Sequence, residues 1–380
     1  LPVVLSVILR LLPVFGVPVI EAGVTGPVLF GLMFWAFCVR FAVPVLAMTA
    51  LVSMDHIPGT DISLTVPYAA EGPGPMFDTL GQVEGAPVVE IDGTEVDDTS
   101  GELRMTTVSV RSGMTLAQAL SRWLTTDDTL VPIEQVFPPD LTPEQVEQAN
   151  KAAFSSSEAA ATVAAMNYLG RPVEVVAAEI IEDSAATGRL EAGDVITAVD
   201  GQGVDKPGQV QEIVRSKQPG EQVTLTLQRG GAELEKTIEL GANPQDEKLA
   251  MLGVYMNSQP VDGVEVSYNL QDIGGPSAGM IFSLAVIDKL SPGELNAGRT
   301  VAGTGTIAED GTVGPIGGIE HKVRAAAEDG VELFLAPAAN CGEALQGQRG
   351  DIVVAQVSTL DDAITAMADF DAGRDVVTCG

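Results

Sequence analysis

Residues 269–280 read Asn-Leu-Gln-Asp-Ile-Gly-Gly-Pro-Ser-Ala-Gly-Met and carry the densest motif of the chain. Residues 264–270 predict a strand before the glycines, and the apolar run 278–290 predicts a helix after them. Ser277 therefore lies near a helix N-terminus. Unpaired N–H groups and the positive end of the helix dipole can stabilise a developing oxyanion there. This pattern predicts a nucleophilic serine.

The backbone next to this serine suits the approach of a substrate. Gly275 and Gly279 have no side chain to keep a substrate backbone away, and Pro276 lies between Gly275 and the serine. We expect backbone N–H groups near Ser277 and Gly275 to hold the oxyanion. A nucleophilic serine also needs a base, and the only histidines are His56 and His321. His56 follows directly after an apolar segment, so a histidine base is not obvious.

Lys322 is the stronger candidate for the base. Residues 319–330 predict a helix that ends at Gly330, with an apolar stripe of Ile319, Val323 and Ala326. Lys322 lies on that packed face, whereas His321 points elsewhere. Burial disfavours an ammonium group and lowers the pKa of lysine, which makes a Ser–Lys pair workable. The alternative is a lysine whose stem packs while its amine reaches solvent.

Two sequence stretches resemble the proteolytic domain of Lon-type proteases. They are GGPSAGM at 274–280 and GTGTIAEDGTVGPIGGIEHK at 303–322, within a similarity that extends from about Met251 to the C-terminus. The resemblance implies that Ser277 is the nucleophile, that Lys322 is the base and that Thr304 orients the lysine. Many Lon enzymes have an acidic residue three positions before the serine. This chain has Gly274 there, and Asp272 is a candidate replacement.

Residues 168–243 have a different sequence pattern. Their stretch LEAGDVITAVDGQGV at 190–204 resembles the PDZ domain. In that family a peptide adds as a strand to a sheet edge, and backbone N–H groups of a loop hold its carboxylate. The resemblance places this loop at Leu169, Gly170 and Arg171. Pro172 has no N–H group, so the loop is one donor short and internal or extended segments remain possible ligands. A simple spacer is the alternative.

Composition excludes some classes of partner. The chain has 380 residues, 20 basic and 52 acidic, and a formal net charge of −32. This charge argues against a nucleic-acid-binding protein, because a phosphate backbone needs a basic surface. No G-x-x-x-x-G-K-[ST] loop is present, and the two histidines are too scattered for a typical zinc site. We therefore expect no cofactor, no metal and no ATP.

The N-terminal residues 1–54 contain only three charges. Within them, residues 28–54 form an apolar run with Arg40 as the single charge, long enough to cross a bilayer. Residues 1–20 are a poorer second span because they contain three prolines and an arginine. A buried helix is the alternative, and a cleaved signal peptide is not expected.

The cysteines bear on the compartment. Cys38 lies inside the predicted span, which leaves Cys341 and Cys379 as a possible disulfide. Such a pair would suit an oxidising compartment. Two unrelated buried thiols are the alternative.

The combined pattern resembles the ATP-independent, membrane-anchored PDZ and Lon-like proteases of bacteria, with an α+β fold. The resemblance implies that the catalytic part faces outside the cytoplasm, that the substrates are polypeptides, and that a homo-oligomer is possible because Lon domains commonly form rings. The predicted parts are an anchor at 1–54, a mixed α/β segment at 55–165, a PDZ domain at 166–243 and a Lon-like proteolytic domain at 244–380.

Two rival functions remain. Residues 275–279 also fit the G-x-S-x-G pattern of α/β-hydrolases, with Ser277, Asp310 and His321 in the right order for an esterase triad. The interval from serine to histidine is short for that fold. The other rival is a catalytically silent scaffold that presents peptides through the PDZ module.

Overall fold

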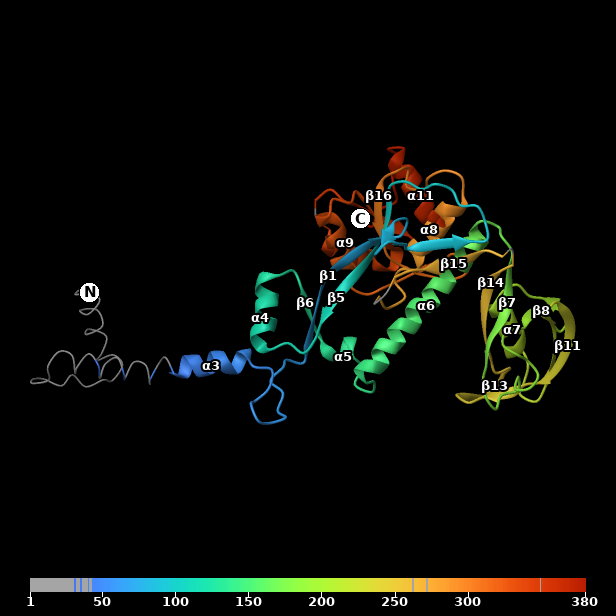
Figure 1. The fold of residues 1–380 in the computed structure, drawn as a ribbon, viewed down its shortest axis with the longest axis horizontal. Helices are drawn as coiled ribbons and strands as arrows, with labels where there is room; N and C mark the ends of the chain where they lie inside the picture. Colours follow the sequence, from blue (N-terminus) through green and yellow to red (C-terminus); the bar gives the residue numbers. More distant parts are fainter. Residues whose placement is uncertain are drawn as a thin grey trace, which may run out of the picture. The chain divides into compact units, whose positions relative to one another are not determined.

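The structure is a computed structural model that describes residues 31, 35, 40, 43–261, 263–270, 273–348 and 350–380 (Figure 1). The chain divides into two compact units. Unit 1 comprises Leu1–Pro67 and Gly113–Leu124, and unit 2 comprises Tyr68–Ser112 and Thr125–Gly380.

Unit 1 contains helix α3 (Val43–Ser53) and helix α4 (Leu116–Thr125, whose last residue belongs to unit 2). All of the second apolar run 1–20, and 12 of the 27 residues of the predicted span 28–54, lie outside the described residues. Among the residues that are described, no helix is both long enough and apolar enough to cross a bilayer.

The larger sheet of unit 2 has six strands in the order β20-β19-β16-β5-β1-β6. Strands β5, β16, β19 and β20 are parallel neighbours, whereas β1 pairs antiparallel with both β5 and β6. The strand bounds are Tyr68–Asp78 (β1), Glu102–Arg111 (β5), Thr129–Pro132 (β6), Thr300–Gly303 (β16), Leu333–Pro337 (β19) and Val353–Val357 (β20).

Helices cover both faces of this sheet. Their bounds are Gly279–Leu290 (α8), Ile319–Glu328 (α9), Cys341–Gly347 (α10) and Leu360–Asp371 (α11). In β19, Leu333 and Leu335 pack with α8 and α11, whereas Phe334 and Ala336 pack with α9 and α10. Because alternate residues of a strand point to opposite faces, α8 and α11 cover one face and α9 and α10 the other.

This sheet crosses the predicted domain boundaries. We predicted residues 55–165 and 244–380 as separate parts, yet β1, β5 and β6 lie in one sheet with β16, β19 and β20. Strand β4 (Val89–Asp92) likewise pairs with β15 (Glu265–Tyr268). Local periodicity reveals that a strand exists but does not reveal its distant partner. Strands β1, β5 and β6 therefore belong to the same α/β layers as the Ser277 region.

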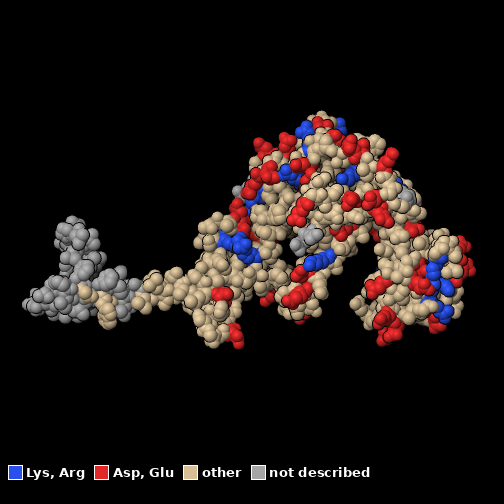
Figure 2. Space-filling view, in the orientation of Figure 1, with Lys and Arg blue, Asp and Glu red and all other residues tan. Residues whose placement is uncertain are grey.

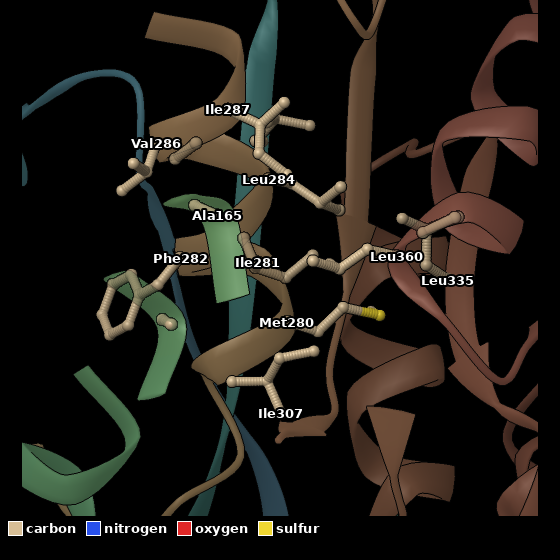
Figure 3. Close-up of a cluster of buried hydrophobic side chains, with 14 of the residues drawn as sticks. Ala165, Met280, Ile281, Phe282, Leu284, Val286, Ile287, Ile307, Leu335 and Leu360 are labelled. Atoms are coloured by element: carbon tan, nitrogen blue, oxygen red, sulfur yellow. The ribbon is translucent and has the colours of Figure 1, made fainter. Parts of the chain in front are cut away.

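Helix α8 forms the centre of the main core (Figure 3). It is apolar on all sides and almost completely buried, as expected for a helix enclosed by other elements. Phe282 and Ile281 leave it on opposite sides. Phe282 meets Phe154 of the long helix α6 (Pro143–Tyr168) with ring centroids 5.7 Å apart. Helix α6 thus packs directly against the helix that follows Ser277.

A second sheet follows the order β11-β10-β8-β7-β14, with β9 beside β8. It encloses its own core together with helix α7 (Pro207–Arg215). Strand β7 has a neighbour on each side, β8 and β14, so its two edges are both paired. The bounds are Val173–Ile180 (β7), Val195–Val199 (β8), Gln202–Gly203 (β9), Gln222–Arg229 (β10), Ala232–Glu239 (β11) and Val254–Pro260 (β14).

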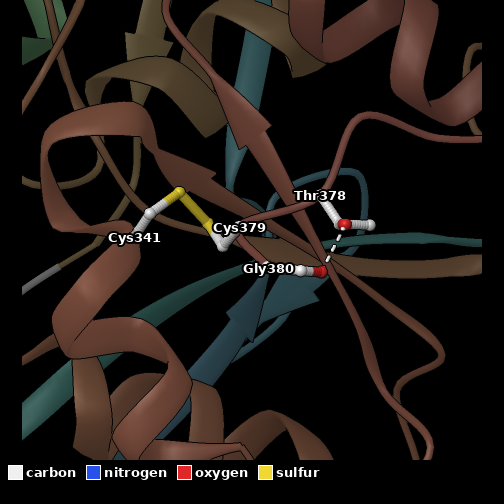
Figure 4. Close-up of a disulfide and its surroundings, with 4 residues drawn as sticks. All are labelled: Cys341, Thr378, Cys379 and Gly380. Carbon is white, nitrogen blue, oxygen red and sulfur yellow. Dashed lines mark hydrogen bonds between the residues drawn. A yellow bond between two sulfur atoms is a disulfide. The ribbon is translucent and has the colours of Figure 1, made fainter.

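Short elements complete the described chain. They are Gln82–Val83 (β2), Ala86–Pro87 (β3), Gly241–Asn243 (β12), Asp246–Met251 (β13), Thr306–Ile307 (β17), Val313–Gly314 (β18), Ile133–Val136 (α5) and the 3₁₀ helix Ala338–Asn340 (η3). Cys341 at the start of α10 forms a disulfide with Cys379, with Cα atoms 4.9 Å apart (Figure 4). The disulfide fixes the C-terminal residues to the α9–α10 layer.

Candidate active site

Ser277 lies in the turn that leads into α8, and its carbonyl is held from two directions. The Gly305 N–H donates to the Ser277 carbonyl over 2.9 Å, and the Thr304 hydroxyl donates to it over 3.1 Å. The Met280 N–H in turn donates to the Gly305 carbonyl. Because Thr304 and Gly305 directly follow β16, these bonds fix the serine at the carboxyl end of a central strand. Ligands of open α/β sheets commonly bind at this end.

Lys322 reaches the same point from the opposite helical layer. Its side chain is 2% exposed, and its Nζ lies 2.9 Å from Ser277 Oγ and 2.9 Å from Thr304 Oγ1. No carboxylate lies among these partners. Burial lowers the pKa of Lys322 to about 7, because the ammonium loses its hydration without gaining a countercharge. A neutral amine is therefore accessible near neutral pH.

The apolar stripe of α9 explains why the lysine points inward. Ile319, Val323 and Ala326 pack on the sheet, as the spacing predicts. The helix begins after Gly318, which has φ of +64°, a conformation that favours glycine. Lys322 is carried on the same inward face, one helical turn from Ile319.

Thr304 gives the hydrogen bonds a direction. A threonine hydroxyl has one hydrogen, and Thr304 donates it to the Ser277 carbonyl. The hydroxyl oxygen must then accept an N–H from Lys322. In the neutral amine, this leaves the lone pair of Nζ available to the hydrogen of Ser277 Oγ, so the three residues are arranged for proton transfer.

Gly275, Pro276 and Gly279 were predicted to face the substrate or its oxyanion, but the structure gives them other contacts. The Gly275 N–H donates to the Asn150 carbonyl over 2.9 Å, so it is not available to an oxyanion. The Pro276 carbonyl accepts a hydrogen bond of 3.0 Å from Ser157 Oγ. Gly279 is buried, and a Cβ atom there would lie 2.7 Å from Ser157 Oγ. Gly279 therefore allows α6 to pack closely and does not face a substrate.

The remaining candidates for an oxyanion site are the amides of Ser277 and Ala278. Within the described part of the chain, neither has a hydrogen-bond acceptor. Both precede α8, where the helix dipole favours negative charge. These two amides of the serine's own turn are therefore the candidates for oxyanion donors.

Helix α6 contributes residues that the sequence did not single out. Asn150, Phe154 and Ser157 all contact the serine loop or line the space in front of it. A Cβ atom at Gly274, where many Lon enzymes have an acid, would lie 3.0 Å from Asn150 Cβ. Asp272, the suggested replacement, lies outside the described residues. No local motif marks these α6 residues, because their role depends on a distant packing partner.

A cleft of about 460 Å³ opens in front of Ser277 and Lys322. Strands β1 and β5, helix α6 and the loop before α9 supply its walls. Among the described residues that line it, apolar side chains dominate and Lys322 is the only charged one. The main apolar contributors are Pro75, Met105, Val108, Val110, Phe154 and Ile273.

The residues of the esterase alternative do not meet. His321, predicted to point away from the packed face, is 1% exposed. Helix α9 is packed against both β1 and α10, so more than its sheet face is covered. Neither ring nitrogen has a hydrogen-bond partner among the described residues, and Nε2 lies 3.5 Å from Glu320 Oε1. The Asp310 carboxylate accepts a hydrogen bond from the Thr312 N–H. No Ser–His–Asp triad is assembled.

The loop predicted to hold a peptide carboxylate has another role. The N–H groups of Leu169, Gly170 and Arg171 donate to carbonyls in the last turn of α6. They therefore cap that helix and are not available to a carboxylate. The end strand of the second sheet beside β7 is β14, and both α6 and α7 contact it. A Gly253 turn with φ of +82° precedes this strand.

Two protein families match separate parts of unit 2. Residues 271–368 match the family described as Lon protease (S16) C-terminal proteolytic domain. Residues 145–240 match the PDZ domain family. The chain therefore contains a serine-peptidase domain of the Lon type together with a PDZ domain.

Individual relatives cover parts of the chain. An archaeal Lon protease of Methanothermobacter thermautotrophicus is 29% identical over 154 residues, which are 40% of this chain and 21% of that protein. This chain thus spans about a fifth of the length of that relative. The PDZ domain of an SdrC-like protein of Listeria monocytogenes is 24% identical and covers 22% of this chain and 85% of its own, with a TM-score of 0.20. A protein of Geobacillus thermodenitrificans is 35% identical and covers 22% and 94%, with a TM-score of 0.20.

Proposed function

We propose that the protein is an ATP-independent, membrane-anchored serine endopeptidase in which Ser277 is the nucleophile and Lys322 the base. The observation that carries this proposal is the position of the Lys322 amine, which is buried and lies 2.9 Å from both Ser277 Oγ and Thr304 Oγ1. An amine in this environment is neutral in part at pH 7 and can accept a proton.

The first half of the proposed reaction forms an acyl-enzyme. Lys322 takes the proton of Ser277 Oγ, and the oxygen attacks the carbonyl carbon of the scissile peptide. The carbonyl oxygen becomes an oxyanion next to the Ser277 and Ala278 amides. When the C–N bond breaks, the Lys322 ammonium returns its proton to the leaving nitrogen.

The second half releases the acyl group. Lys322 is neutral again and takes a proton from a water molecule, whose oxygen attacks the ester carbonyl. The tetrahedral intermediate collapses as Ser277 Oγ leaves, and the ammonium gives its proton back to that oxygen. The products are a new carboxylate and a regenerated dyad.

The cleft favours an extended polypeptide with an apolar side chain near the cleaved bond. Met105, Val108 and Phe154 line the space beside the serine, and none of them can pair with a charge. A folded chain does not present its backbone in this way. Since the sequence has no phosphate-binding loop, we propose that the substrates are already unfolded or have exposed tails.

We propose that the PDZ domain binds substrate or a regulatory peptide along β14. This strand lies at the edge of its sheet, and α7 lies beside it. PDZ ligands add as a strand to an exposed edge.

We also propose that residues 28–54 anchor the protein and that the protease faces outside the cytoplasm. The apolar composition of this run supports an anchor. The Cys341–Cys379 disulfide supports an oxidising compartment. A homo-oligomer is part of the same proposal and rests on the behaviour of Lon-like domains alone.

Labelling and hydrolysis together test the enzymatic assignment. The purified chain is treated with a fluorophosphonate, and the labelled peptide is mapped, while an unfolded fluorogenic casein is digested with and without ATP. We expect the label on Ser277 and equal hydrolysis in both conditions. Ser277→Ala should lose both signals, and Ser156→Ala, an exposed serine of α6, should keep them.

The rival functions predict different results. A silent scaffold would leave Ser277 unlabelled and the casein intact. An esterase would lose activity in His321→Gln and keep it in Lys322→Arg. Our proposal predicts the reverse, because arginine remains charged and cannot act as the base.

A further inference from the structure

Helix α4 presents its large apolar side chains to solvent. Leu116, Leu120, Trp123 and Leu124 lie on one face, at positions i, i+4, i+7 and i+8, and are between 42% and 69% exposed. A helix of a globular protein normally turns such a stripe toward the core. Exposed apolar patches of this kind mark binding or membrane-contact surfaces.

One side of α4, directly beside this stripe, is packed inward. Ala119 is 5% exposed, and Met114, just before the helix, is 1% exposed. Thr115 and Gln118 cap the first turn through reciprocal hydrogen bonds between side chain and backbone. The small Ala119 therefore makes the buried contact of α4, while the large apolar residues beside it on the helix stay exposed.

Hydrogen bonds tie the start of α4 to the chain that follows the proposed anchor. The Val66 N–H donates to the Met114 carbonyl over 2.9 Å, and Thr65 pairs with Thr115. Thr65 is 12 residues beyond Ser53, the last residue of α3. Of the 22 large apolar residues exposed in the described part of the chain, 12 belong to unit 1. The exposed surface of α4 therefore belongs to the same small unit as the apolar run.

The charge pattern also changes around α4. Residues 105–126 include Arg111 and Arg122 but no acidic residue, although 52 of the 380 residues are acidic. In Figure 2 acidic side chains are spread over the visible face of unit 2, whereas the surface around α4 is mainly uncharged. A surface that approaches phospholipid headgroups has this combination of apolar, aromatic and basic residues.

We propose that α4 is an interfacial helix that lies in the bilayer surface beside the anchor. Leu116, Leu120 and Leu124 would enter the outer part of the acyl region, and Trp123 would lie at the headgroup level, where tryptophan is enriched. The inference rests on the proposed anchor and is independent of the proposed peptidase activity.

The two tryptophans of the chain provide separate reporters. Trp123 is the only tryptophan in Trp35→Phe, and Trp35, inside the proposed anchor, is the only one in Trp123→Phe. Each full-length variant is reconstituted into vesicles of equal parts phosphatidylcholine and phosphatidylglycerol, with or without brominated acyl chains. We expect bromine to reduce Trp123 emission roughly twofold and to quench Trp35 as well.

Matched substitutions test whether the stripe causes the contact. In the Trp35→Phe background, Leu116→Ser with Leu120→Ser should reduce the quenching of Trp123. Leu141→Ser, an exposed leucine of unit 2, should leave it unchanged.

The outcomes separate the two proposals. Quenching of Trp35 with an unquenched, water-like Trp123 would overturn the α4 proposal and leave the anchor intact. Absence of quenching in both variants would overturn both proposals. A Trp123 emission that shifts to the blue with protein concentration, without bromine quenching, would show that a second copy covers α4 and would also overturn the proposal.

Discussion

At the scale of single residues, Thr304 determines which way the Lys322 amine points. Its hydroxyl donates to the Ser277 carbonyl and accepts from Nζ, so it connects the backbone of the nucleophile with the base. Thr304 is completely buried, and water cannot replace this hydroxyl from the bulk solvent. It acts as a positioning residue.

Thr304→Val should lower kcat about 10- to 100-fold with a small change in KM, because proton transfer loses its alignment while the cleft stays open. Thr304→Ser keeps the hydroxyl and should retain most of the activity. Steady-state hydrolysis of a fluorogenic peptide measures both constants. Equal activity of the valine and serine variants would contradict the positioning role.

Lys322 also makes stability depend on pH. Its pKa is about 7 in the folded chain and near its ordinary value of 10.5 in the unfolded chain, so between these values only the unfolded chain holds the proton. Stability of the wild type should therefore rise with pH across this window, by up to about 1.4 kcal/mol per pH unit. Below about pH 7 both states are protonated, and the buried ammonium destabilises the fold.

Lys322→Met removes this titration. The free energy of unfolding of Lys322→Met minus that of the wild type should decrease as the pH rises from about 7 to 10. Urea unfolding at several pH values measures the difference. Lys151→Met, at an exposed lysine, is the control and should show no such trend below pH 9 or so. A constant difference for Lys322→Met would contradict the lowered pKa.

The sequence predicted the orientation of some single residues correctly and of others wrongly, and the physical reason can be given for each. The helical stripe places Lys322 inward because it depends only on spacing along α9. The same argument placed His321 outside, although it is buried, because α9 is also packed against β1 and α10. The occupation of the Gly275 N–H by the Asn150 carbonyl was also not predictable, since the two residues are far apart in the sequence.

At the scale of elements, α6 braces the catalytic loop. Ser157 is 5% exposed, and its hydroxyl holds the Pro276 carbonyl next to the nucleophile. Phe154 packs on Phe282 and also lines the cleft. Helix α6 thus connects the position of the loop with the shape of the substrate site.

Ser157→Ala should leave the Pro276 carbonyl without a donor and cost about 1–3 kcal/mol of stability. Because the loop loses a contact next to Ser277, kcat should fall more than KM rises. Thermal unfolding and peptide hydrolysis measure the two effects. The neighbouring exposed Ser156→Ala should behave as the wild type, and a Ser157→Ala enzyme with unchanged kcat would show that α6 does not position the loop.

Element boundaries were predictable where local signals are strong. The helix predicted over residues 319–330 is α9, and Gly330 follows it with φ of +76°. The loop at 169–171 was expected to bind a carboxylate because its sequence resembles a PDZ loop. Its amides instead complete the last turn of α6, since the intrahelical carbonyls are close and otherwise unpaired.

At the scale of the whole molecule, the disulfide links the C-terminus to the layer that carries Lys322. Cys341 begins α10, which packs on α9, and the Cys379 N–H donates to the Val354 carbonyl of β20. The bond therefore closes a loop of 38 residues across β20 and α11.

Cys341→Ser with Cys379→Ser should lower the free energy of unfolding by about 3 kcal/mol, mainly because the unfolded chain gains freedom. A reductant should lower the melting temperature of the wild type but not that of the double variant. Thermal unfolding with a thiol assay measures this. An unchanged melting temperature of demonstrably reduced wild type would contradict a stabilising disulfide.

The domain arrangement was the least predictable feature. The motifs located the serine loop and the PDZ-like strands, because each motif is contiguous. The larger sheet takes strands from residues 68–132 and 300–357, which come before and after the PDZ-like sheet in the sequence. Strand pairing over such distances leaves no local signal in one sequence, so the segment 55–165 could not be assigned to the sheet in advance.

The most direct test of the central claim is the rate at which a fluorophosphonate acylates Ser277 as a function of pH. The probe does not titrate, so the profile reports the base that activates the serine. A neutral, buried Lys322 predicts a rate that rises with an apparent pKa of about 7 in the wild type and is nearly abolished in Lys322→Arg. A rate that is independent of pH, or that rises only near the ordinary lysine pKa, would contradict it.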